Sequence, residues 1–138
     1  MRFFLLFFSI FFYSNVLYSD ENQPFLKGKF FYEKKNFSKA KLEFEKSIVL
    51  DPKKTNSYIY LSKIYSETKN TEEEKKNLQT AVLLEPQNEE ALYFLSLVNI
   101  TEGDFKSLEI NYNALSKNCS KLCEKLSSIK SSIDKFKK

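Results

Sequence analysis

The most constraining feature of this sequence is a repeat with a period of about 34 residues, in the range that is typical of stacked helical units. Residues 47–52 read SIVLDP and return as AVLLEP at residues 81–86, so that Pro52 and Pro86 occupy the same place in successive units. Other apolar positions follow the same shift: Leu26, Tyr60 and Phe94; Phe30, Ile64 and Val98; Phe44, Leu78 and Tyr112. The repeat indicates stacked supersecondary units, each of which buries apolar surface against its neighbours.

Each unit contains two amphipathic stretches at helical spacing. In the middle unit the first comprises Tyr58, Leu61, Ile64 and Tyr65, and the second comprises Leu78, Ala81, Val82 and Leu84. The residue before a proline is disfavoured in a helix, so Pro52 and Pro86 end their units. Thr71 and Glu74 have the spacing of a capping box, and Gly103 with Asp104 predicts a turn followed by a helix cap.

Composition agrees with a helical chain and excludes several chemistries. The 138 residues include only two Gly, three Pro and no His, where average usage would give about ten Gly and seven Pro. Without an imidazole, Ser-His-Asp hydrolysis and His-ligated zinc are excluded. The net charge of +4 is too evenly mixed to indicate nucleic-acid binding. No nucleotide or metal motif is present, and we expect neither catalysis nor a cofactor.

The repeat resembles the tetratricopeptide repeat (TPR) family, whose units are helix–turn–helix motifs of about 34 residues. The middle unit carries the resemblance through Tyr58, Leu61, Ser62, Tyr65, Leu78, Ala81 and Pro86. The outer units match at Gly28, Phe31, Ala40, Phe44 and Pro52, and at Leu92, Leu95, Ser96, Gly103 and Tyr112. The resemblance implies an all-α, right-handed superhelix with three repeats in residues 20–122, namely 21–54, 55–88 and 89–122.

Residues 123–138 predict a further amphipathic helix. Apolar residues recur at alternating spacings of four and three, at Leu122, Leu126, Ile129, Ile133 and Phe136. A solenoid needs a terminal helix with one apolar and one polar face, so we interpret this segment as a C-terminal capping helix. A basic helix on a membrane surface and a coiled-coil segment are the alternatives.

The N-terminal segment has the pattern of an export signal. Arg2 precedes an apolar run that continues to Tyr13, which is shorter than the roughly twenty residues of a spanning helix. We expect residues 1–19 to be a signal peptide cleaved after Ser19, and the protein to be exported to the periplasm or cell envelope. An uncleaved membrane anchor and a buried apolar helix are the alternatives.

Cys119 and Cys123 are the only cysteines. In an exported protein an even number of cysteines favours pairing, so a structural disulfide is the first hypothesis. Free thiols and a redox-active pair are the alternatives, although the spacing is not the C-x-x-C of thioredoxin-like proteins.

The resemblance also implies a binding groove, because the first helices of stacked TPR units line a concave face. The predicted groove residues are Phe25, Lys29, Tyr32, Asn56, Ile59, Lys63, Tyr93 and Leu97. Exposed aromatic residues flanked by lysines suit an extended peptide. We therefore expect a non-catalytic scaffold that binds a protein or peptide. Packing of this stripe against another copy or the N-terminal segment is the competing interpretation. The alternative function is a membrane-anchored, self-associating structural subunit that retains residues 3–18.

Overall fold

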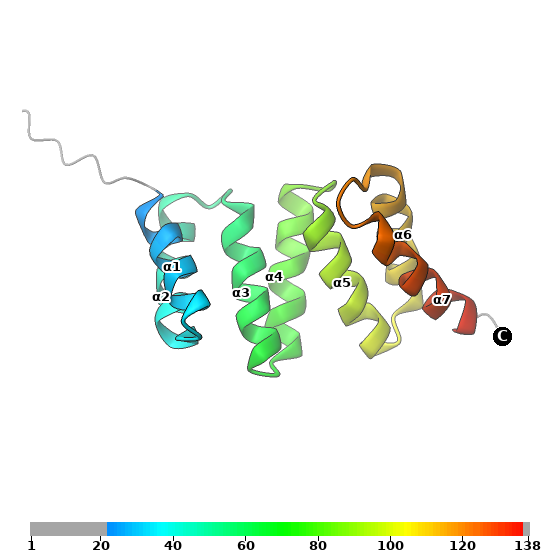
Figure 1. Cartoon of the computed structure of the whole chain (residues 1–138), viewed down its shortest axis with the longest axis horizontal. Coiled ribbons are helices and arrows are strands. Elements are labelled where there is room, and N and C mark those ends of the chain that lie inside the picture. The colour runs from blue at the N-terminus through cyan, green and yellow to red at the C-terminus, as the bar shows by residue number, and fades with distance from the viewer. Residues whose placement is uncertain (1–21, 137–138) are drawn as a thin grey trace, which may run out of the picture.

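The computed structural model describes residues 22–136, and the predicted signal segment, residues 1–19, lies outside the described residues. The regular structure in this range is entirely helical: α1 (Gln23–Glu33), α2 (Phe37–Leu50), α3 (Thr55–Glu67), α4 (Thr71–Leu84), α5 (Glu89–Glu102), α6 (Phe105–Asn118), a short 3₁₀ turn η1 (Cys123–Lys125) and α7 (Leu126–Phe136). The helices stack in one row, with α1 and α2 at one end and α7 at the other (Figure 1). The all-α solenoid predicted from the repeat is the observed architecture.

The same turn joins the two helices of each repeat. Lys35, Lys69 and Gly103 occupy equivalent places in the three repeats, and all three adopt a left-handed backbone, with φ of 57°, 58° and 71°. The next residue in each case, Asn36, Asn70 or Asp104, caps the second helix by accepting a backbone N–H bond at 3.1–3.2 Å. This hydrogen bond satisfies one of the free donors of the first helical turn. The turn and cap predicted at Gly103 and Asp104 are therefore confirmed.

The predicted capping box at Thr71 and Glu74 is wrong by one residue. Asn70 occupies the cap position and Thr71 is the first helical residue. The Asn70 side chain accepts from the backbone N–H of Glu73, so the cap hydrogen bond is made by Asn70 and not by Thr71. Glu74 instead lies half-buried near Ser66, where desolvation raises the pKa of its carboxyl although the Ser66 hydrogen bond opposes this.

Gly28 allows α1 to approach α2 closely. A Cβ atom added at Gly28 would lie 2.6 Å from Cε1 of the fully buried Phe44 ring. The homologous position in the next two repeats holds a buried serine, Ser62 or Ser96. Phe44 fills the space that the missing side chain at Gly28 leaves.

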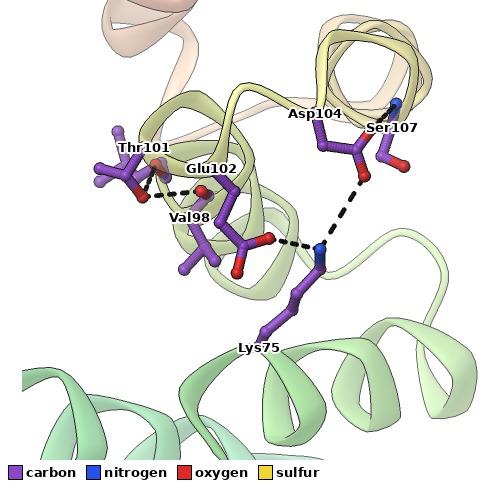
Figure 2. Close-up of polar contacts among 7 residues, drawn as sticks. Lys75, Val98, Thr101, Glu102, Asp104 and Ser107 are labelled. Carbon is purple, nitrogen blue, oxygen red and sulfur yellow. Dashed lines mark hydrogen bonds and ion pairs between the residues drawn. The ribbon is translucent and has the colours of Figure 1, made fainter. Parts of the chain in front are cut away.

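Consecutive repeats are joined by buried and charged contacts. Between α2 and α3, the buried Ser57 hydroxyl donates to the Ser47 hydroxyl at 2.9 Å. Between the second and third repeats, Lys75 of α4 points toward Glu102 and Asp104 (Figure 2). Its Nζ lies 2.5 Å from Glu102 Oε2 and 3.9 Å from Asp104 Oδ2. Lys75 thereby links α4 to both the end of α5 and the cap of α6.

Helix α7 covers the last repeat. Ile129 and Ile133 are buried in one cluster with Leu92, Leu108 and Leu115 of α5 and α6. The Phe136 ring stacks on Phe105 with centroids 3.6 Å apart. The apolar positions predicted for a capping helix therefore face the third repeat, and its lysines remain outside.

Candidate functional site

The first helices of the three repeats, α1, α3 and α5, carry the predicted groove residues. Lys29, Tyr32 and Phe25 are half-buried on α1, and Asn56 is exposed at the start of α3. Lys63 is half-buried on α3. On α5, Tyr93 is half-buried and Leu97 is 37% exposed. These seven residues have surface to offer a partner.

Ile59 does not. It is only 1% exposed and packs against Ala81 of α4 and Ala91 of α5. Two alanines without longer side chains allow the neighbouring helices to close over this position. The expectation that Ile59 contributes to an exposed stripe is therefore wrong, and Ile59 is a core residue.

An aromatic cluster centred on Tyr60 forms the N-terminal part of this face. The Tyr60 ring stacks on Phe44 with centroids 4.9 Å apart, and meets Phe25 and Tyr32 edge-on at 5.8 and 5.3 Å. Burial, together with the Glu67 carboxylate, raises the pKa of the Tyr32 hydroxyl. Tyr60 and Phe94 share one repeat position, and neither is among the predicted groove residues. The cluster fixes Tyr32 as a rigid, neutral aromatic surface.

Lys63 connects α3 to α5 and is already paired. Its Nζ lies 2.6 Å from Glu90 Oε1, 4.8 Å from the centroid of the Tyr60 ring and 5.4 Å from that of Phe94. Lys63 is therefore held over two aromatic faces while its charge is balanced by Glu90. An acidic ligand would have to displace Glu90, which the sequence prediction did not anticipate. Within residues 22–136, Lys29 has no such ion pair.

Two clefts adjoin one another on either side of Lys63 and Glu90. The first has a volume of about 340 Å³ and is lined by Tyr32, Ser62, Lys63, Ser66, Glu67, Glu74 and Phe94. The second, of about 460 Å³, is lined by Gln87, Asn88, Glu89, Glu90, Tyr93, Phe94, Ser120, Lys121 and Leu122. Phe94 borders both clefts, so they are neighbours on the face formed by α1, α3 and α5. Among the predicted residues, Tyr32, Lys63 and Tyr93 line them.

A disulfide loop builds the far wall of the second cleft. Cys119 and Cys123 are joined by a disulfide across a Cα–Cα distance of 5.3 Å, in the segment between α6 and α7. Helix α6 ends at Asn118, so both cysteines lie beyond it. The chain leaves the helix at Cys119, and the bond closes a short loop.

Glu89 holds this loop against the start of α5. Its carboxylate accepts hydrogen bonds from the Ser120 hydroxyl and from the backbone N–H groups of Ser120, Lys121 and Leu122, at 2.5–2.9 Å. The Ser120 hydroxyl bond is the main cause that lowers the pKa of the Glu89 carboxyl to about 2, followed by the Leu122 N–H. No motif in the sequence pairs Glu89 with residues 120–122. The only signal is that they lie just under one repeat period further on.

Within residues 22–136 no group of three or more His, Cys, Asp or Glu side chains is arranged to hold a metal ion. None of the helices in that range combines the length and the apolar character that crossing a membrane requires.

Comparison with known proteins agrees with this architecture. Residues 55–88, the middle helix pair, match the family model described as tetratricopeptide repeat. No curated protein matches the sequence significantly.

Three solved structures share the fold at low sequence identity. The TPR2B domain of yeast Sti1 in a pHsp70 complex has a TM-score of 0.75 at 12% identity, covering 84% of this chain and 97% of that one. The Yersinia enterocolitica type III secretion chaperone SycD, in complex with a peptide of the translocator YopD, gives 0.76 at 12% identity, covering 85% and 94%. The first TPR of Spaghetti (RPAP3), bound to the Hsp90 peptide SRMEEVD, gives 0.69 at 14% identity, covering 83% and 96%. Residues 55–88 therefore match the tetratricopeptide-repeat model, and the described chain shares its fold with solved TPR domains.

Proposed function

We propose that this protein is a non-catalytic scaffold that binds an extended peptide or protein segment across α1, α3 and α5. The observation that carries the proposal is the pair of clefts that meet at Phe94. Together they offer aromatic surface from Tyr32, Phe94 and Tyr93, interrupted by the Lys63–Glu90 ion pair. Rigid aromatic surface with a few fixed charges is the composition of peptide-binding sites.

The similar solved structures support this proposal. SycD is in complex with a peptide of YopD, and the first TPR of Spaghetti is bound to an Hsp90 peptide. At identities of 12% and 14% these proteins share the fold with this chain, so their individual ligands are not transferred to it. Their relevance is that the same arrangement of helices accommodates a peptide ligand.

We also propose that the scaffold operates after export, with residues 1–19 serving as the signal. The Cys119–Cys123 disulfide supports this compartment, because disulfides persist in oxidising environments and are rare in the cytosol. The mass of the protein purified from its own cells tests the proposal: a chain that begins at Asp20 is expected. A full-length chain in the membrane fraction would favour a membrane-anchored, self-associating subunit instead.

Site-specific photocrosslinking tests the binding function. The photoreactive residue p-benzoylphenylalanine is placed at Tyr93, in the second cleft, and in a control at Val49, which is 80% exposed on the second helix α2. In native extract we expect discrete adducts from position 93 that Phe94→Ala removes, because that ring borders both clefts. Equal adducts from both positions, no adduct from position 93, or adducts insensitive to Phe94→Ala would contradict the proposal.

A further inference from the structure

The solenoid presents an uncovered face at its N-terminal end. By the repeat shift, Leu26, Lys27 and Phe30 of α1 correspond to Tyr60, Leu61 and Ile64 of α3, and to Phe94, Leu95 and Val98 of α5. Leu61, Ile64, Leu95 and Val98 are all buried, whereas Leu26 is 53% and Phe30 51% exposed. We call Leu26, Lys27 and Phe30 the N-terminal end face.

At the corresponding positions of α3 and α5, the side chains that cover this face come from the second helix of the preceding repeat. Leu61 and Ile64 of α3 lie in one cluster with Ala40 and Phe44 of α2. Leu95 and Val98 of α5 lie in one cluster with Leu78 of α4. An occupant of the N-terminal end face therefore has the geometry of a helix laid across α1.

The charge of the end face restricts which helix can bind there. Lys27 stands where the next repeats have a buried leucine, and Lys34 Nζ lies 4.2 Å from the centroid of the Phe30 ring. Residues 21–54 contain nine lysines and five acidic residues, whereas residues 89–122 contain three lysines and five acidic residues. A helix that covers Leu26 and Phe30 must also balance Lys27, because an unpaired buried charge is strongly destabilising.

Two candidate occupants lack an acidic residue that could balance Lys27. Residues 3–16 precede α1 by the same interval as α2 precedes α3, but they contain no acidic residue. A second copy docked through the same end face would bring another lysine-rich first repeat against this one. We propose that the N-terminal end face binds an amphipathic helix of a partner protein, which packs apolar residues on Leu26 and Phe30 and sets a carboxylate against Lys27. This site is separate from the clefts of α3 and α5.

The experiment places p-benzoylphenylalanine at Leu26 of the full chain in native extract and maps each adduct by mass spectrometry. We expect the crosslinked segment to belong to another protein and to be an amphipathic helix with an acidic residue. Lys27→Glu is expected to reduce this adduct about tenfold or more, the effect of turning an attractive buried pair into a repulsive one. In the separate protein that carries p-benzoylphenylalanine at position 93, the same Lys27→Glu substitution is expected to leave the adduct unchanged.

Lys53→Glu is the matched control, because it makes the same charge change in the first repeat but lies in the turn between α2 and α3. It should change the Leu26 adduct by less than about twofold, the scale of an exposed charge. An adduct with residues 3–16, an adduct between two copies, equal losses in both variants, or no adduct would each overturn the proposal. Retention of the circular-dichroism spectrum separates loss of binding from loss of folding.

Discussion

The two ends of the solenoid are built differently. At the C-terminal end, Ile129 and Ile133 of α7 fill the apolar surface of the third repeat. At the N-terminal end, Leu26 and Phe30 expose half of their side-chain surface within the described part of the chain. A helix pair of this kind cannot bury both of its faces alone. Helix α7 is therefore part of the folded core, whereas the N-terminal end presents exposed apolar residues.

The largest expected effect comes from truncating matched aliphatic residues at the two ends. Ile129→Ala removes a fully buried side chain and should lower the free energy of unfolding by about 2–5 kcal/mol. Leu26→Ala removes a half-exposed one and should cost less than about 1 kcal/mol. Urea denaturation of both variants measures the difference. Equal losses would mean that the ends are equivalent and that Leu26 is covered.

A smaller effect is expected inside the first repeat. Gly28→Ala places a methyl group against the Phe44 ring, and overpacking of this kind costs about 1–3 kcal/mol. Ser62→Ala, at the homologous position of the second repeat, is the control because it adds no volume. Urea denaturation compares both variants with wild type. A Gly28→Ala protein as stable as wild type would show that α1 is not held closely on α2.

The C-terminal closure should weaken in acid through Glu89. Its folded-state pKa of about 2 lies below the ordinary value of 4.5, so ionised Glu89 stabilises the fold fully above pH 4.5. This contribution falls as the pH drops from 4.5 and is lost below 2. Thermal melting of wild type and Glu89→Gln should therefore differ at pH 7 and converge near pH 2. The control Glu124→Gln, whose carboxyl is exposed, should follow wild type throughout; a constant Glu89→Gln difference down to pH 2 would contradict the role of the carboxylate.

The smallest effect distinguishes the turns of the first and third repeats. Lys35 adopts a left-handed backbone where the third repeat has Gly103. Lys35→Gly should relieve this strain and change the free energy of unfolding by about 1 kcal/mol or less in the stabilising direction. Gly103→Ala should have the opposite sign. Chemical denaturation that shows the same sign for both variants would refute the backbone explanation.

Much of the fold follows from the sequence, because a repeat reports each structural position more than once. The repeat shift places the helices and identifies Gly103 and Asp104 as a turn and cap. It also carried the signal that the capping-box prediction overlooked, since Asn36, Asn70 and Asp104 are equally spaced. The local capping-box motif points to Thr71, whereas the repeat position shows that Asn70 caps the helix.

The site was less accessible to sequence reasoning, because its contacts join different repeats. Ile59 shares a repeat position with Phe25 and Tyr93, yet two alanines on neighbouring helices bury it. The pairing of Lys63 with Glu90 and of Glu89 with the loop after Cys119 depends on how α5 sits against its neighbours. Helical periodicity describes one helix at a time and contains none of this information.

Hydrogen exchange of the protein alone and with the partner captured through position 93 tests the central claim most directly. Binding across the clefts predicts new amide protection concentrated in the first helices, α1, α3 and α5, and in residues 120–122. Protection confined to the second helices, α2, α4 and α6, would contradict a scaffold that binds its partner on the first-helix face.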